Sequence, residues 1–397
     1  MLNFKGGIRP DSHKYTKNFN ITDSLSPEFV KLAVNDSPIC VNVGDNVAIG
    51  QKITNDNRFH SPICGTVTNT DCGYVTINNN HECAVSNECK PFSKKLSDAT
   101  FNDIVSFVSK KSIRFDDDYL DTRLKKSLNK VSILLVSCGE TVPFSCSRNR
   151  ILSEHKKEII YGTQIIMKAL SIRKAAITIE ALDLKNRFEL KKALKNNNNI
   201  SVVTHSSKYP AEHPKILKDQ FLNKYFSNDR DTTADNVLVV GCEEVFELYN
   251  SFRTGLPMIS RVITVDGDAV LSPKNIKTPI GTDINYLLNF CETNINELSS
   301  IVINNPICSS YNKDCEYTKK DISCVLALTK KFEQVGSYNC ISCKKCRDVC
   351  PVELDPIELL KNQIETTKCI CCGACTYACP AKIDFSPIYE RTEADYE

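Results

Sequence analysis

Two cysteine-rich blocks near the C-terminal end constrain this chain more than any other feature of its sequence. Residues 340–351 and 369–380 both follow the spacing C-x2-C-x2-C-x3-C-P. Three thiolates on such a short loop can wrap three corners of a cubane, and the short helix after the third cysteine carries the fourth away to a second cluster. The closing proline turns the chain and has no N–H to donate. The repeat therefore predicts a module that holds two [4Fe–4S] clusters.

The same rule predicts crossed ligand sets, with three thiolates from one block and one from the other. Two zinc sites are the alternative, but repeated four-cysteine blocks that end in proline are not typical of zinc proteins. Cys371 is expected to be a non-ligand, because using it in place of Cys372 gives intervals that fit the pattern poorly. The predicted ligands are Cys340, Cys343, Cys346 and Cys379 for one cluster, and Cys369, Cys372, Cys375 and Cys350 for the other.

The overall charge is nearly balanced, with 50 Lys and Arg residues against 48 Asp and Glu residues in 397. No net field favours nucleic acid or an anionic membrane, so neither is expected as a direct partner. Lys344, Lys345, Arg347 and Lys368 lie near the predicted ligands. They form either a solvated basic face or a docking site for an acidic electron carrier, and the sequence leaves both open.

The chain has 21 cysteines, of which nine fall within residues 340–379. In a long chain this usage favours metal or redox chemistry over disulfides. No apolar run approaches the roughly 18–20 residues that span a bilayer. The N-terminus lacks the apolar segment of a signal peptide. We expect a cytoplasmic protein that reaches a membrane only through partner proteins.

The pattern upstream of the cysteine blocks changes character along the chain. Up to about residue 95, short β runs alternate with Gly, Asn and Asp turn signals, which predicts a small sandwich or barrel. From about residue 100 to 255, alternating strands and helices predict a parallel sheet with helices on both faces. A small α+β unit follows, and residues from about 318 are expected to be helical. Strands are predicted at 131–138, 175–180, 200–204 and 237–240, and helices at 155–170, 183–194, 214–221 and from Glu243.

Several motifs resemble the RnfC family, relatives of the flavoprotein subunit of respiratory complex I. F-K-G-G-I-R-P at 4–10 resembles the family's N-terminal opening, and 41–53 with 61–67 resembles its barrel-sandwich hybrid domain. I-T-V-D-G-D-A-V at 263–270, followed by 278–288, resembles its ligand-binding β-grasp (SLBB) module. The barrel lacks the M-K-M tripeptide of biotinyl and lipoyl carriers, so a structural role is favoured over a swinging arm.

The resemblance implies a multidomain chain of mixed α/β and β architecture. It implies a central Rossmann-like sheet that corresponds to the complex I flavoprotein and a C-terminal two-cluster module like a ferredoxin. The expected domains are 1–98 (barrel-sandwich hybrid), 99–255 (Rossmann-like), 256–315 (SLBB β-grasp) and 316–397 (ferredoxin-like).

One departure from the family pattern concerns the flavin site. The family builds its FMN and NADH site on a glycine-rich loop, because backbone must approach phosphate closely there. The matching stretch here, 113–121, contains no glycine and four aspartates. Of the next family motif, matched by 138–144, Glu140 remains as a weak, degenerate flavin-site residue. We therefore expect FMN and NADH binding to be absent.

Cys138 and Cys146 flank the end of the first strand of the predicted parallel sheet, where such folds place ligands. Losing a flavin would leave an open crevice there. A helix expected to begin near Leu152 could then lower a thiol pKa and make the two cysteines redox-active. The alternative is that both are ordinary buried cysteines.

Three hypotheses for the function follow. The leading one is an electron-transfer protein that passes electrons through its clusters from a donor protein to a partner reductase, as in the proline reductase-associated PrdC subgroup of anaerobes. The second is an FMN- and NADH-binding RnfC-type subunit of a membrane-associated NADH:ferredoxin oxidoreductase. The third is a scaffold subunit of a redox complex. Whether the chain is an enzyme in its own right stays open, but an oxidoreductase subunit that transfers electrons is favoured over a self-sufficient enzyme.

Overall fold

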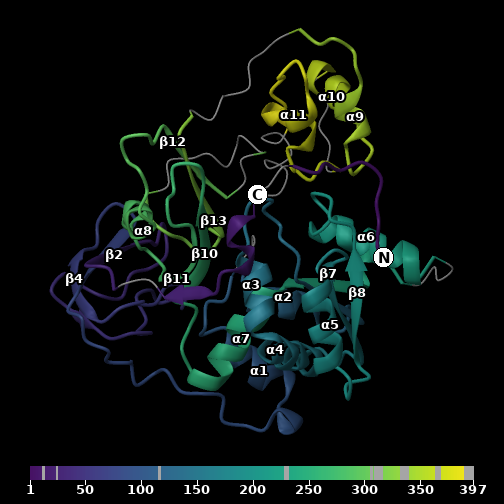
Figure 1. The fold of residues 1–397 in the computed structure, drawn as a ribbon. Helices are drawn as coiled ribbons and strands as arrows, with labels where there is room; N and C mark the ends of the chain where they lie inside the picture. The colour runs from purple at the N-terminus through teal and green to yellow at the C-terminus, as the bar shows by residue number, and fades with distance from the viewer. Residues whose placement is uncertain are drawn as a thin grey trace.

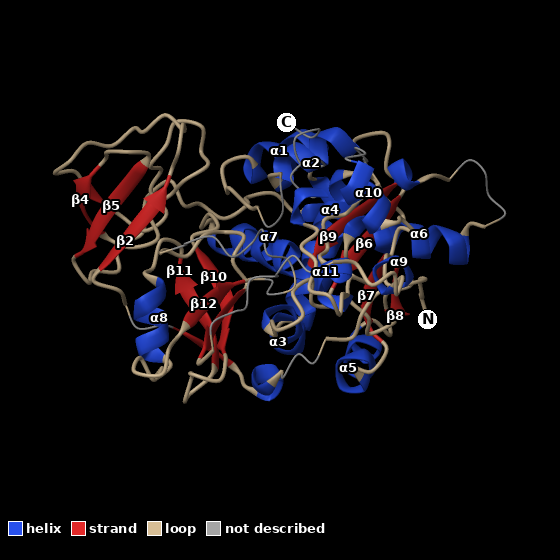
Figure 2. Ribbon diagram, turned by 90° about the horizontal axis from the view of Figure 1, so that it is seen from above, coloured by secondary structure: helices blue, strands red, loops and turns tan. Residues whose placement is uncertain are grey.

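A computed structural model describes residues 1–10, 14–23, 26–114, 118–227, 232–304, 307, 316–330, 339–362 and 368–388. Figure 1 shows the helical C-terminal module above the central domain, and the N-terminal segment running between them. Figure 2, seen from above, separates the sheet of the N-terminal domain from the central sheet.

The central sheet is parallel, with strand order β8-β7-β6-β9. β6 and β9 are almost continuous apolar runs because both faces of the sheet are covered, whereas β8 contains polar Ser201 and Thr204. Leu134 and Val136 pack into the core shared with α4 and α7, whereas Leu135 packs on the opposite face with Leu217 of α6. The predicted parallel sheet is therefore confirmed. The strands are β6 (Ile133–Ser137), β7 (Lys174–Glu180), β8 (Ile200–His205) and β9 (Val237–Gly241).

The helices of this domain follow the predicted order with one correction. The helix predicted at 155–170 is confirmed as α4, but a separate helix, α3, precedes it. The two helices meet at His155, where the backbone leaves helical geometry (φ −125°, ψ 38°). The first of them begins at Ser147 and not near Leu152. Its sequence, S-R-N-R, hides the start from a hydrophobicity pattern, because Arg148 and Arg150 are buried. The helices are α1 (Phe101–Val108), α2 (Leu120–Ser127), α3 (Ser147–Glu154), α4 (Lys156–Ala169), α5 (Leu184–Ala193), α6 (Pro214–Tyr225) and α7 (Cys242–Thr254), with short 3-10 turns η2 (Leu96–Asp98) and η3 (Ala234–Asn236).

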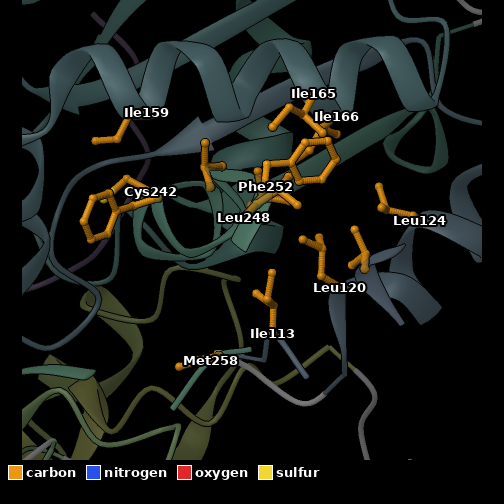
Figure 3. Packing of buried hydrophobic residues seen from close by; sticks show 14 of the residues in the cluster. Ile113, Leu120, Leu124, Ile159, Ile165, Ile166, Cys242, Leu248, Phe252 and Met258 are labelled. Carbon is orange, nitrogen blue, oxygen red and sulfur yellow. The ribbon is translucent and has the colours of Figure 1, made fainter. Parts of the chain in front are cut away.

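A continuous core joins the helices on one face of the central sheet. Leu120 and Leu124 of α2 point towards Leu248 and Phe252 of α7 (Figure 3). These side chains are at most 7% exposed. The packing fixes α2, and with it the end of the acidic stretch 113–121, against the central domain.

The N-terminal sheet is antiparallel, with order β2-β5-β4-β3. It contains strands from residues 29 to 79, while residues 1–10 and 14–23 lie against other parts of the molecule. Leu2 bridges to His205 at the end of β8, and β1 (Ile21–Asp23) pairs with β11 of the third sheet. The strands are β2 (Phe29–Ala33), β3 (Asn46–Val47), β4 (Gly65–Asn69) and β5 (Tyr74–Asn79).

The third sheet has the order β1-β11-β10-β13-β12 and packs on α8 (Ile284–Phe290). It corrects the expectation that residues from about 318 are helical, because β13 pairs in parallel with β10 inside this sheet. The run C-V-L-A-L is too short for a helix and is almost wholly buried, which is typical of an interior strand. The strands are β10 (Ser260–Asp266), β11 (Lys274–Pro279), β12 (Ser300–Ile303) and β13 (Cys324–Leu328).

In its described residues, the C-terminal module consists of three short helices and the loops that carry the cysteine blocks. Its small core forms around Phe385, which is fully buried, together with Leu359 and Ile388. Of the helices in the described ranges, none is long and apolar enough to cross a membrane. The helices are α9 (Lys345–Asp348), α10 (Pro356–Asn362) and α11 (Ala374–Ala378).

Candidate metal centres and the adjoining sheet edge

The predicted ligands of the first cluster line one cavity. Sulfur-bearing side chains from both blocks meet there around a volume of about 180 Å³. Cys340 and Cys343 are exposed, which places this cavity near the solvent. Apolar side chains, Phe385 among them, line its inner wall. The four cysteines in the lining are Cys340, Cys343, Cys346 and Cys379.

The predicted ligands of the second cluster line another cavity, of about 30 Å³. All four of its cysteines are partly buried. The fourth thiol of each set comes from the other block, because α9 and α11 carry the chain away from one cavity and towards the other. The four cysteines in this lining are Cys350, Cys369, Cys372 and Cys375.

Backbone amides face the sulfurs in a repeated pattern. The Ser342 N–H donates to Cys340 Sγ and the Cys371 N–H donates to Cys369 Sγ, both over 3.4 Å. The Leu354 N–H reaches Cys350 Sγ over 3.3 Å, and the Ile383 N–H reaches Cys379 Sγ over 3.4 Å. Such donors stabilise negative charge on thiolates that ligate a cluster.

Cys371 occupies the same structural position as Ser342 of the other block. Both have a positive φ, of 49° and 55° respectively, which turns the loop so that the amide faces the preceding thiol. Cys371 is absent from the lining of the second cavity. Its backbone therefore has a clear role that does not require its thiol as a ligand.

Within the described stretches, no group of three or more His, Cys, Asp or Glu side chains has the geometry of a site for a metal ion.

The N-terminal motif F-K-G-G-I-R-P contacts the second set of cysteines. A Cβ atom on Gly6 would lie 2.6 Å from the carbonyl oxygen of Cys350, and the Gly7 N–H donates to Val349 O over 2.8 Å. The Tyr209 hydroxyl, from the loop after β8, donates to Cys372 O over 2.8 Å. The second set therefore lies between the N-terminal motif and the carboxyl edge of the central sheet. The motif alone gave no sign of this contact.

Cys138, Glu140 and Cys146 line one small pocket at the end of β6, and neither cysteine forms a disulfide. The expected open crevice is wrong. The pocket measures about 10 Å³, roughly the room for one water molecule. The turn η1 (Tyr15–Asn18) packs on α3 beside it. Lys14, just before the turn, lines the pocket and pairs with Glu180 over 3.6 Å.

The electrostatics of this pocket also differ from expectation. Cys146 lies at the amino end of α3, yet burial, helped by the Glu140 carboxylate, raises its thiol pKa to about 12. The expected lowering of a thiol pKa therefore does not occur at Cys146. Burial likewise raises the pKa of Glu140 to about 7, although Lys14 and an N–H from Asn149 oppose the shift.

A buried polar network at the same edge was not predicted. Ser137 donates to the Glu212 carboxylate, which pairs with His205. The Arg148 guanidinium donates to Ser137 Oγ over 3.1 Å and to Glu243 over 2.5 Å. Burial acts to lower the pKa of His205, but the Glu212 carboxylate outweighs it and raises that pKa. Ser137 and His205 end strands β6 and β8, and only that position could have indicated the network.

The acidic stretch 113–121 is only partly described, because residues 115–117 lie outside the described ranges. Of its aspartates, Asp121 pairs with Arg58 over 2.9 Å and Asp118 pairs with Lys126 over 2.7 Å. These two carboxylates therefore hold residues 118–121 in place through ion pairs.

Comparison with known proteins identifies two parts of the chain. Residues 2–88 match the RnfC barrel-sandwich hybrid domain. Residues 120–250 match the Nuo51 FMN-binding domain, and this match begins at the end of the glycine-free stretch.

Relatives extend the likeness over most of the chain. A subunit of the ion-translocating oxidoreductase complex of Buchnera aphidicola subsp. Baizongia pistaciae is 26% identical over 82% of this chain and 68% of its own length. A subunit of the proton-translocating ferredoxin:NAD(+) oxidoreductase complex of Clostridium ljungdahlii is 26% identical over 90% of this chain and 83% of its own. The Na(+)-translocating counterpart of Acetobacterium woodii is 25% identical over 90% and 86%.

Among solved structures, an NAD+-reducing [NiFe]-hydrogenase in the air-oxidized state matches 57% of this chain and 46% of its own, with a TM-score of 0.48 and 10% identity. The two domain matches and the relatives from ion-translocating complexes support an RnfC-like family for this chain.

Proposed function

We propose that this chain passes electrons through two [4Fe–4S] clusters between partner proteins of a redox complex. The supporting observation is that each of the two crossed cysteine sets lines its own cavity. The relatives are named as subunits of oxidoreductase complexes, so donor and acceptor proteins are the expected partners. Within this role, the finer proposal is a PrdC-type chain that serves a reductase.

The residues of each cavity suit such a cluster. When bound, a [4Fe–4S] cluster supplies one-electron transfer. Cys340, Cys343, Cys346 and Cys379 would hold one, and Cys369, Cys372, Cys375 and Cys350 the other. The backbone amides described above stabilise thiolate charge, and apolar side chains exclude water.

The two cavities differ in exposure, and this difference suggests an order of electron transfer. The first set contains two exposed cysteines, whereas the second lies against the N-terminal motif and the loop after β8. We propose that a partner protein exchanges electrons at the first set. Lys344 and Arg347 line that cavity, and they favour a carrier with acidic groups at its contact surface.

We propose further that the chain binds neither FMN nor NADH tightly. The stretch 113–121 has no glycine, and the pocket at the end of β6 has room for about one water molecule. Lys14 and Lys17 line that pocket, so the N-terminal segment helps to close it.

The second candidate function is an FMN-bearing, NADH-oxidising subunit. The match of residues 120–250 to an FMN-binding domain favours it, as do the names of the relatives. A scaffold subunit is the third candidate.

Anaerobic purification, with iron, sulfide and flavin counted per chain, separates these candidates. We expect about eight iron and eight sulfide, and no stoichiometric flavin. We also expect that NADH alone does not reduce the visible absorbance of the clusters. Stoichiometric FMN with NADH-driven bleaching would instead establish the second candidate. If a partner complex still turns over after the clusters are removed, the scaffold candidate would be established.

A further inference from the structure

Two thiols meet at the carboxyl edge of the central sheet. Ser137 of β6 and Gly241 of β9 are register partners in neighbouring parallel strands. Cys138 and Cys242 directly follow them, so the two cysteines leave the sheet at the same level. Neighbouring strands lie about 4.8 Å apart, which falls inside the roughly 4.4–6.8 Å Cα separation that a disulfide spans.

The two side chains interact directly, and neither is in a disulfide. Cys138 is 2% exposed and Cys242 is fully buried in the same core as Ile159 (Figure 3). Cys146, the other cysteine of the small pocket, has different neighbours. Its amide donates to Thr264 Oγ1 of β10 over 2.9 Å. The geometry therefore pairs Cys138 with Cys242 and leaves Cys146 on the side of the third sheet.

A chain of buried polar groups leads to this pair. The Cys242 thiol lies 3.8 Å from Glu243 Oε2, and Glu243 also accepts from Arg148. Arg148 donates to Ser137, which donates to Glu212. Glu212 pairs with His205, which begins the loop that continues to the Tyr209 contact with Cys372. Polar groups thus connect the thiols to the loop that touches the second cysteine set.

We propose that Cys138 and Cys242 form a reversible dithiol–disulfide couple, a two-electron site in addition to the iron–sulfur clusters. Oxidation forms the Sγ–Sγ bond and releases two protons and two electrons. The two oxidised clusters accept one electron each, and reduction of the disulfide runs the same steps backwards. The exchange with the clusters rests on the proposed function, whereas the disulfide itself does not.

The protonation state of the Cys242 thiol agrees with such a dithiol–disulfide couple. Burial raises the pKa of Cys242 well above its ordinary value, so the reduced form keeps its proton. Each reduction must then bring protons into a buried site, and the Glu243 carboxylate beside the Cys242 thiol is a group that can take up and pass on a proton. Within the chain of buried polar groups, it is the group nearest to that thiol.

The first test maps the bond in the wild-type holoprotein and needs no variant. Anaerobic protein is oxidised with diamide, which takes up the two electrons and two protons as its hydrazine. Free thiols are then alkylated and the chain is cut with trypsin. Cys138 and Cys146 fall in the peptide 131–148, and Cys242 falls in 231–253. We expect these two peptides to be linked through Cys138. A link within 131–148, a link through Cys146, or no link would overturn the proposal.

The second test counts electrons. Diamide-treated wild type and Cys242→Ser are titrated with dithionite, and wild type should take up about two electrons more per chain. Cys291→Ser, which removes a buried cysteine of the third-sheet unit, is the matched control and should behave like wild type. Equal uptake by wild type and Cys242→Ser would contradict the couple. Iron content and cluster bleaching are measured in the same samples, so a failure of the iron–sulfur proposal shows separately from a missing disulfide.

Discussion

Glu140 lies in a different environment in the structure from the one that its sequence motif implies. The family motif makes it a remnant of a flavin site, but here its carboxyl lies in a pocket shared with Lys14 and Cys146. It accepts the Asn149 N–H over 2.9 Å, at the start of α3. Because burial raises its pKa to about 7, its protonation changes near neutral pH and couples to folding.

Replacing Glu140 with Gln should therefore change the pH dependence of stability. The folded state holds a proton on Glu140 that the unfolded chain has lost, between the ordinary value of 4.5 and about 7. The free energy of unfolding of wild type falls as pH rises through that window, and Gln does not titrate. The free energy of unfolding of Glu140→Gln, relative to that of wild type, should rise by roughly 3 kcal/mol between pH 4.5 and 8, at about 1.4 kcal/mol per pKa unit.

Thermal unfolding midpoints of both proteins at pH 5.5 and pH 8, under argon, measure this effect. Glu297→Gln removes an exposed carboxylate and serves as the control, with no such gain expected at pH 8. If the midpoints of Glu140→Gln and wild type differ by the same amount at both pH values, Glu140 titrates normally.

Residue roles were predictable where the signal is local. The spacing of the cysteine blocks is local, and it assigned the same sets that line the two cavities. The assignment of ligands itself stays a prediction. The network of Ser137, His205 and Glu212 was not predictable, because its members come from strands and loops far apart in sequence.

At the scale of elements, the N-terminal motif F-K-G-G-I-R-P packs directly against the backbone of the cysteine module. Gly6 has a φ of 71°, and a side chain there would meet the backbone of Cys350. Only glycine satisfies both the left-handed conformation and the close approach.

Gly6→Ala should therefore displace Cys350 and weaken the second site. We expect reconstituted protein to lose about half of its iron, with the first site retained. Gly44→Ala is a matched control, because Gly44 also has a positive φ, of 96°, but nothing lies within 4 Å of its added Cβ. It should cost about 1–2 kcal/mol of backbone strain and no iron. Equal iron in the two variants would show that the motif does not hold the second site.

The elements that the sequence misplaced share a physical cause. Strands β6 and β9 of the parallel sheet were found because burial on both faces gives almost continuous apolar runs. The start of α3 was missed because Arg148 and Arg150 are buried through ion pairs, which a hydrophobicity pattern cannot show. The strand β13 was missed because its partners β10 and β12 lie earlier in the chain, outside the stretch from about residue 318 that was expected to be helical.

At the scale of the molecule, the domains converge on the second cysteine set. The N-terminal motif, the loop after β8 and the cysteine module meet there, while the first set is nearer to solvent. The proposed electron path would run between a protein docked at the first set and the carboxyl edge of the central sheet. The domain matches show which known domains parts of the chain resemble. Whether the cysteine module works as proposed depends on which cysteines share a cluster.

Iron counts on paired cysteine variants test that pairing most directly. Wild type, reconstituted anaerobically, should hold about eight iron per chain, and Cys350→Ala about four. With crossed ligands, Cys350→Ala combined with Cys369→Ala removes two ligands of one cluster and should still leave about four. Cys350→Ala combined with Cys340→Ala removes a ligand from each cluster and should leave almost none. The reverse result for the two double variants would contradict the crossed clusters, and a wild type that takes up zinc but no iron would contradict the clusters altogether.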